Sequence, residues 1–173
     1  MKRIIVEGVD GSGKTTLIDK LRSEFHFLTV VVNEKQADQD FENWWPKILE
    51  TDHGDRVPIH DRFYYSELVY GPIIRGNSLG SPALHVRVRN QLRREAFLIY
   101  ARPSLDAIIK GAEVNPQMDG VKVYLEELTN SYDAIMRAQQ HYYDGRFYQY
   151  DWRYKSDYPA LVDKLERYLL GGN

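Results

Sequence analysis

"IIVEGVDGSGKTT" (residues 4–16) is a short apolar run that breaks into three glycines and a lysine. The run is β-branched and stops at a glycine, as buried strands do. Leu17, Leu21 and Phe25 follow at intervals of four residues, which is typical of an amphipathic helix. Residues 8–15 fit G-x-x-x-x-G-K-[ST] at every fixed position, between that strand and that helix. This stretch therefore predicts a loop that binds the phosphates of a nucleoside triphosphate.

Each part of this loop has a chemical role. The glycines let consecutive backbone N–H groups point at phosphate oxygens, and the helix start adds the positive end of its dipole. Lys14 brings a positive charge to the β- and γ-phosphates, and the Thr15 hydroxyl is placed to bind Mg²⁺. A glycine-rich turn without a ligand is the weaker alternative. The predicted nucleotide-binding residues are Gly8, Gly11, Ser12, Gly13, Lys14, Thr15 and Thr16.

The rest of the chain alternates predicted strands with predicted helices. Apolar runs predict strands at 2–6, 27–33, 56–62, 97–101 and 146–152. Apolar periodicity and capping residues predict helices at 14–25, 39–50, from 81 onward, 104–111, 121–143 and 157–171. Residues 111–120, with a glycine at each end and a proline inside, predict an exposed loop. The alternation predicts one α/β domain, residues 1–173, with a five-stranded, mainly parallel sheet.

The composition narrows the class of protein. A net charge of -2 over 173 residues gives no general attraction to nucleic acid. The absence of cysteine excludes disulfides and thiolate zinc sites. No stretch approaches the roughly 20 apolar residues of a membrane span, and the N-terminus lacks the apolar core of a signal peptide. We expect a cytoplasmic protein with no membrane partner.

Two segments resemble the signatures of thymidylate kinases. "EGVDGSGKTT" (7–16) is similar to the P-loop of that family, which has Glu before the first glycine and Asp inside the loop. "DRFYYSELVYG" (61–71) is similar to the second signature, an Asp-Arg-aromatic run with a Ser and a Tyr-x-Gly-like ending. The resemblance implies a P-loop nucleotide-kinase fold, ATP with Mg²⁺, and phosphoryl transfer to a deoxynucleoside monophosphate such as thymidylate or a related pyrimidine. It is compatible with a homodimer.

The short chain and the short 111–120 loop are also similar to the small nucleotide kinases of bacteriophages. In such enzymes a loop of this kind acts as a lid, and we expect 111–120 to be the lid here. Neither the P-loop nor 111–120 contains an arginine that could stabilise charge on the transferring phosphoryl group. The basic residues that could replace it are Lys110, Lys122, Arg102 and Arg137.

The resemblance also assigns roles by motif position. Asp10 lies beside the sugar and phosphate of the acceptor, Asp61 lies near the metal and its water shell, and Arg62 binds the acceptor phosphate. An arginine suits that role, because its fork binds a phosphate bidentately and screens the repulsion between two polyanions. A surface ion pair is the alternative for Arg62. The predicted catalytic residues are Lys14, Arg62, Asp10 and Glu7, and the predicted metal-binding residues are Thr15 and Asp61.

Glu7 leaves the class of acceptor open. A phosphate oxygen needs no base, whereas a nucleoside hydroxyl gains from a carboxylate that accepts its proton. Deoxynucleoside kinases carry Glu at this place, so the first alternative is a kinase for a deoxynucleoside or for a hydroxymethylated base in DNA. The second alternative is a nucleotide-binding regulatory protein without transfer. Arg62 in an Asp-Arg signature favours a phosphorylated acceptor, and nucleic acid is not expected beyond that role as an acceptor.

Aromatic and basic residues suggest further acceptor contacts. Phe63 and Tyr70 belong to an aromatic cluster straight after Arg62, which suits stacking on a nucleobase as well as core packing. Arg93 lies on the helix that begins at 81, where a solvated helix face is the alternative to a substrate contact. The predicted substrate-binding residues are Asp10, Arg62, Phe63, Tyr70 and Arg93.

Overall fold

Five parallel strands form the central sheet of the computed structural model, in the order β2-β3-β1-β4-β5. The model describes residues 1–32, 41–114 and 121–171. Its strands are β1 (Arg3–Glu7), β2 (Leu28–Val32), β3 (Val57–Asp61), β4 (Ala96–Ala101) and β5 (Phe147–Tyr150). Because all five run the same way, their carboxyl ends share one edge of the sheet, where ligands bind in this class of fold. The predicted α/β fold is confirmed, with a wholly parallel sheet.

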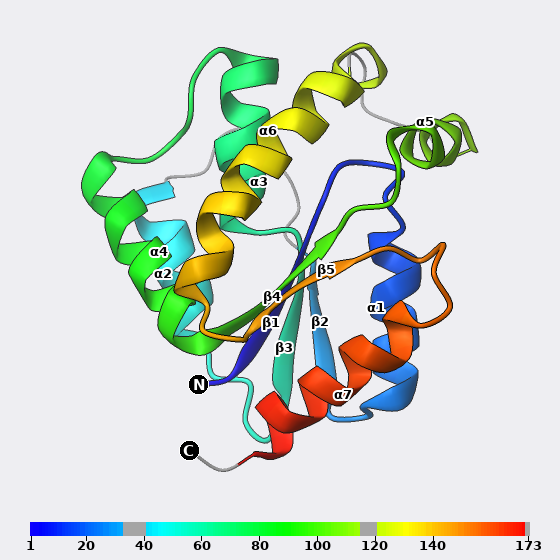
Figure 1. Cartoon of the computed structure of the whole chain (residues 1–173). Helices are drawn as coiled ribbons and strands as arrows, with labels where there is room; N and C mark the ends of the chain where they lie inside the picture. Colours follow the sequence, from blue (N-terminus) through cyan, green and yellow to red (C-terminus); the bar gives the residue numbers. More distant parts are fainter. Residues whose placement is uncertain (33–40, 115–120, 172–173) are drawn as a thin grey trace.

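Helices cover both faces of the sheet (Figure 1). One face carries α1 and α7, the other carries α2, α3, α4 and α6, and α5 lies above the carboxyl edge, next to the loop from β1 to α1. The helices are α1 (Lys14–Glu24), α2 (Phe41–Glu50), α3 (Tyr64–Tyr70), α4 (Pro82–Glu95), α5 (Leu105–Val114), α6 (Leu125–Gln139) and α7 (Asp157–Leu170). None of the helices in the described residues is long and apolar enough to cross a membrane.

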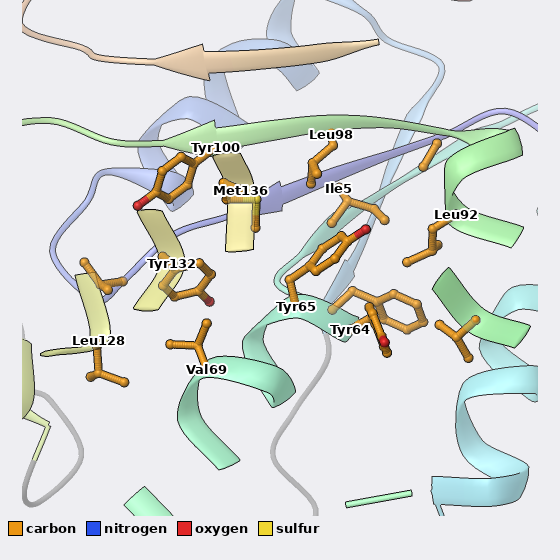
Figure 2. Packing of buried hydrophobic residues seen from close by; sticks show 14 of the residues in the cluster. Ile5, Tyr64, Tyr65, Val69, Leu92, Leu98, Tyr100, Leu128, Tyr132 and Met136 are labelled. Carbon is orange, nitrogen blue, oxygen red and sulfur yellow. The ribbon is translucent and has the colours of Figure 1, made fainter. Parts of the chain in front are cut away.

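The alternation of side chains along β1 divides the core in two. Ile4 and Val6 join one cluster, under α1 and α7, and Ile5 joins the other, under the helices of the opposite face; all three are 0% exposed. The second cluster is rich in tyrosine, and Figure 2 shows Tyr100 and Tyr132 together in it. Both faces of the sheet are therefore covered, as parallel sheets require.

Helix α3 and the π-helical segment Gly71–Arg75 that follows it were not predicted from the sequence. Helix α3 has only seven residues, too few for a clear periodic pattern. Its N-terminal N–H groups are bound by Glu7, a residue distant in sequence. The helix therefore depends on a tertiary contact that local sequence does not reveal.

The predicted end of the helix at Gly111 is wrong, because α5 continues to Val114. Gly111 lies inside the helix, where the lack of a side chain lets α5 touch the P-loop: a Cβ on Gly111 would lie 3.1 Å from the Cα of Gly11 and would meet its carbonyl oxygen. The glycine is thus a packing feature and not a helix terminator. The remainder of the predicted lid, 115–120, lies outside the described residues, as do the predicted helix positions 39 and 40.

Candidate active site

The P-loop has the backbone shape that its glycines allow. Gly8, Gly11 and Gly13 have φ angles of 147°, 79° and 88°, which residues with side chains rarely adopt. A Cβ on Gly8 would lie 2.6 Å from the carbonyl oxygen of Ala101, at the end of β4. The loop is therefore packed against the neighbouring strand, and it leads directly into α1, whose first turn carries Lys14 and the exposed Thr15 and Thr16.

Lys14 is folded back onto the P-loop. Its side chain is buried, and Nζ donates a hydrogen bond of 2.8 Å to the carbonyl oxygen of Val9. Burial lowers the pKa of Lys14 to about 7, and the positive charge of Arg62 adds to this effect. Arg62 is therefore close enough to Lys14 for the two positive charges to interact. Lys14 is the residue that would bind the donor phosphates.

Asp10, Arg62 and Tyr70 form a cluster between the P-loop and the end of β3, which we call the Arg62 cluster. Arg62 forms an ion pair with Asp10, and its guanidinium lies 4.8 Å from the centre of the Tyr70 ring. The Tyr70 hydroxyl donates to Asp10 at 2.9 Å. Burial alone would raise the pKa of Asp10, but the charges of Arg62 and Lys14 outweigh it and hold this pKa below its usual value. The structure thus brings three of the predicted site residues together.

Glu7 is fully buried and serves as an acceptor for α3. Its Oε1 accepts hydrogen bonds from the backbone N–H groups of Phe63, Tyr65 and Ser66, at 2.9, 3.2 and 3.3 Å. Its Oε2 accepts from the Ser66 hydroxyl at 2.7 Å and from the Tyr132 hydroxyl at 3.0 Å. Burial raises the pKa of Glu7, while these hydrogen bonds act in the opposite direction. Five donors leave the carboxylate little capacity for a further hydrogen bond.

Asp61 and Thr15 are compatible with a Mg²⁺ site. Asp61 ends β3 beside β1, and its Oδ1 is buried without a hydrogen-bond partner among the described residues. Such an oxygen suits the water shell of a hard cation, and Mg²⁺ usually combines one or two protein ligands with water and substrate phosphates. Residues 1–32, 41–114 and 121–171 contain no cluster of three or more His, Cys, Asp or Glu that could hold a metal by itself.

Two predicted substrate-binding residues lie elsewhere. The Phe63 ring is buried against Trp44 and His60, so its side chain belongs to the core. Arg93 precedes Ala96, which pairs with the first residue of β1, so it lies at the edge of the sheet opposite the P-loop. There it donates to Gln139 at 2.8 and 3.2 Å. The structure does not bring either side chain to the Arg62 cluster.

The four candidate basic residues differ in their surroundings. Arg102, after β4, is held by a bidentate pair with Asp133 at 2.7 and 2.8 Å. Arg137 is exposed on α6 and lines the same cavity of about 600 Å³ as Arg102. Lys110 lies on the face of α5 opposite Ile108, the residue that packs towards the P-loop, and Lys122 is exposed before α6.

Trp152 is a residue that the sequence analysis missed. A Cβ on Gly13 would lie 2.9 Å from Cδ1 of Trp152, so the indole lies directly on the P-loop. It is 47% exposed, which leaves part of the aromatic surface open. The prediction of a strand at 146–152 concealed it, because β5 ends at Tyr150 and Trp152 lies in the following turn. An aromatic residue just after a strand, at the edge shared with the P-loop, was the available signal.

Solved structures with a similar fold include two kinases and a protein in complex with phosphorylated GDP. YorR protein from Bacillus subtilis, in complex with phosphorylated GDP, has 19% sequence identity and a TM-score of 0.74 over 99% of this chain and 100% of its own. Deoxyadenosine kinase from M. mycoides with products dCMP and dCDP has 15% identity and a TM-score of 0.61, with 96% and 99% covered. Polyphosphate kinase 2 from Arthrobacter aurescens TC1 has 14% identity and a TM-score of 0.60, with 99% and 70% covered.

No protein-family model matches the sequence, and no curated protein matches it either. The identities to the solved structures are all below 20%, so the likeness concerns the fold. The chain shares the α/β fold of these structures, with a five-stranded parallel sheet flanked by helices.

Proposed function

We propose that this protein transfers a phosphoryl group from Mg²⁺-bound ATP to a deoxynucleoside monophosphate, most favourably thymidylate or a related pyrimidine nucleotide, and gives the diphosphate. The observation that carries the proposal is the Arg62 cluster. Arg62 pairs with Asp10 and lies close enough to Lys14 for the two positive charges to interact, and a second cation beside the donor-phosphate lysine suits an acceptor phosphate that must approach the donor in line. A protein that only binds a nucleotide has no use for it.

The surroundings of Glu7 favour a phosphorylated acceptor over a hydroxyl. A kinase for a deoxynucleoside, or for a hydroxymethylated base in DNA, benefits from a base that accepts the hydroxyl proton. Both oxygens of Glu7 already accept hydrogen bonds from the protein. A phosphate acceptor needs no base, which agrees with a carboxylate that has a positioning role.

The described residues have different roles in the proposed phosphoryl transfer. Lys14 and the P-loop N–H groups bind the donor phosphates, and the exposed face of Trp152 offers a stacking surface for the donor base. Arg62 breaks its ion pair with Asp10 and binds the acceptor phosphate. Its positive charge then takes the role of the arginine that is missing beside the transferring phosphoryl group. Thr15 and Asp61 would hold Mg²⁺ and its water shell. When bound, the ion would supply positive charge that offsets the negative charge of the phosphates.

A panel of acceptors tests this proposal. ADP release would be measured with ATP and Mg²⁺ against the deoxynucleoside monophosphates, hydroxymethyl-deoxyuridine monophosphate, deoxynucleosides and DNA, with Lys14→Ala as the inactive control. We expect turnover with a pyrimidine monophosphate. Turnover with deoxynucleosides or DNA alone would contradict the proposal, and ATP binding without turnover on any acceptor would indicate a regulatory nucleotide-binding protein.

Glu7→Gln separates the two kinase hypotheses. The hydroxyls of Ser66 and Tyr132 can reverse their hydrogen bonds to accept from a Gln amide, so the site keeps its shape. We expect kcat to fall less than about tenfold, because Glu7 has a positioning role in the proposed reaction. Loss of a general base would instead lower kcat by about 10²–10⁴-fold. Measurement of kcat for Glu7→Gln and for the unaltered protein on the best acceptor decides between the two hypotheses, and a loss of 10²-fold or more with a retained melting temperature would make Glu7 a base.

A further inference from the structure

Tyr132 of α6 lies where three parts of the candidate site meet. It is 0% exposed, and its ring stacks on Tyr100 of β4, with centroids 5.8 Å apart and planes at 23° (Figure 2). On another side it meets Tyr70 edge to face, with centroids 6.3 Å apart. The ring of Tyr132 is therefore fixed between the central sheet and the Arg62 cluster.

The hydroxyl of Tyr132 is as constrained as its ring. It donates to Oε2 of Glu7 at 3.0 Å and lies 2.8 Å from the hydroxyl of Ser66, which itself donates to Glu7. The other oxygen of Glu7 holds the N-terminal N–H groups of α3, the residues directly after Arg62. One tyrosine thus contacts the carboxylate that orients α3 and the aromatic ring on which Arg62 lies.

We propose that Tyr132 is a positioning residue that sets the geometry of Arg62 through Glu7 and Tyr70, so that the acceptor phosphate meets a preorganised guanidinium. The proposal rests on the function proposed above. The positive charge of Arg62 does not depend on Tyr132. However, a guanidinium that must bind two oxygens of a phosphate loses affinity when its backbone or its stacking partner can shift. Tyr132 would therefore affect the acceptor more than the donor.

A buried tyrosine can also serve only the core, and Tyr143 provides the comparison. It is likewise 0% exposed, and its hydroxyl lies 3.0 Å from the hydroxyl of Tyr65. Tyr143 precedes β5, at the edge of the sheet away from the P-loop. Tyr132→Phe and Tyr143→Phe each remove one buried hydroxyl and keep the ring. They differ in that only Tyr132 contacts Glu7 and Tyr70.

Steady-state kinetics with donor and acceptor varied separately give the first test. We expect Tyr132→Phe to raise the KM for the acceptor by up to about tenfold, with the KM for ATP unchanged; the upper bound corresponds to the whole free energy of the lost hydrogen bond to Glu7. Tyr143→Phe should leave both KM values as in the unaltered protein, with a similar change in melting temperature. Equal effects of the two variants on acceptor KM would overturn the proposal.

Hydrogen exchange on the ligand-free protein gives a second test that does not depend on turnover. Tyr132→Phe should increase exchange at the N–H groups of Phe63 and Ser66, whereas Tyr143→Phe should not. An inactive protein that shows this difference would refute the proposed function and keep the positioning role. Unchanged exchange in Tyr132→Phe would refute the positioning role even in an active enzyme.

Discussion

Arg62 combines its charge with an unusual backbone. Its φ angle is 62°, in the left-handed region, and its N–H donates to the carbonyl oxygen of Val6 at 3.0 Å. A residue with a side chain pays about 1–2 kcal/mol for this conformation. The conformation turns the side chain back across the end of β1 to Asp10. Strain of this kind is maintained by surrounding contacts and is commonly found at functional sites.

Comparison of two substitutions isolates the backbone strain. Arg62→Gly and Arg62→Ala both remove the guanidinium, but only glycine adopts a positive φ without strain. We expect Arg62→Gly to be more stable than Arg62→Ala by about 1 kcal/mol, since the strain is relieved. Both variants should lose transfer activity. Chemical denaturation measures the difference, and equal stability of the two would show that the backbone of Arg62 carries no strain.

The spacing of the P-loop motif, together with the resemblance of residues 61–71 to a kinase signature, predicted most of the residues of the candidate site. The fixed positions of the P-loop motif and the Asp61-Arg62 pair follow parallel strands, and the end of β3 lies beside the end of β1. Arg93 could not be placed this way, because its distance from the P-loop depends on the register of β4 against β1. Trp152 was missed for a similar reason: its contact with Gly13 arises from three-dimensional proximity of segments that are remote in sequence.

At the scale of elements, helix α5 packs directly against the P-loop of the candidate site. Gly11 and Gly111 touch backbone to backbone, and neither position has room for a Cβ. The five strands and most of the helices lie where their sequence patterns predicted them. The contact between α5 and the P-loop was not predicted, because a glycine in a helical pattern usually indicates the end of the helix.

Gly111→Ala tests this contact. In an ordinary helix the change stabilises by about 1 kcal/mol. Here the added methyl would meet Gly11, so we expect a lower melting temperature and weaker binding of ATP. Thermal unfolding and nucleotide titration measure the two effects. Glu113→Ala, at an exposed position of the same helix, is the control and should change neither; a stabilised Gly111→Ala would mean that α5 does not pack against the P-loop.

For the molecule as a whole, the buried face of the sheet contains a histidine that limits stability in acid. His60 is 0% exposed on β3, and burial, with the nearby charge of Arg3, lowers its pKa from 6.5 to about 3. Between these values the unfolded chain binds a proton that the folded chain does not. Stability therefore falls as the pH drops from about 6.5 towards 3, and each unit of difference in pKa corresponds to about 1.4 kcal/mol.

His60→Leu should flatten this dependence. The variant lacks the group that takes up a proton on unfolding, so we expect its free energy of unfolding to change less between pH 6.5 and 4 than that of the unaltered protein. Urea denaturation at several pH values gives the slopes. His141→Leu, at an exposed position, should keep the original slope. A slope that is unchanged in His60→Leu would show that other groups control the acid limb.

The positions of the three tryptophans would allow binding of the two proposed substrates to be followed by intrinsic fluorescence. Trp152 lies on Gly13 of the P-loop, while Trp44 packs against Phe63, the neighbour of Arg62, and Trp45 is 1% exposed in the core. An emission change that disappears in Trp152→Phe would report the donor, and one that disappears in Trp44→Phe would report the acceptor. For the proposed reaction the native protein would thus carry a separate optical reporter for donor and acceptor, and the order in which the two substrates bind could be timed in a stopped-flow instrument without a label.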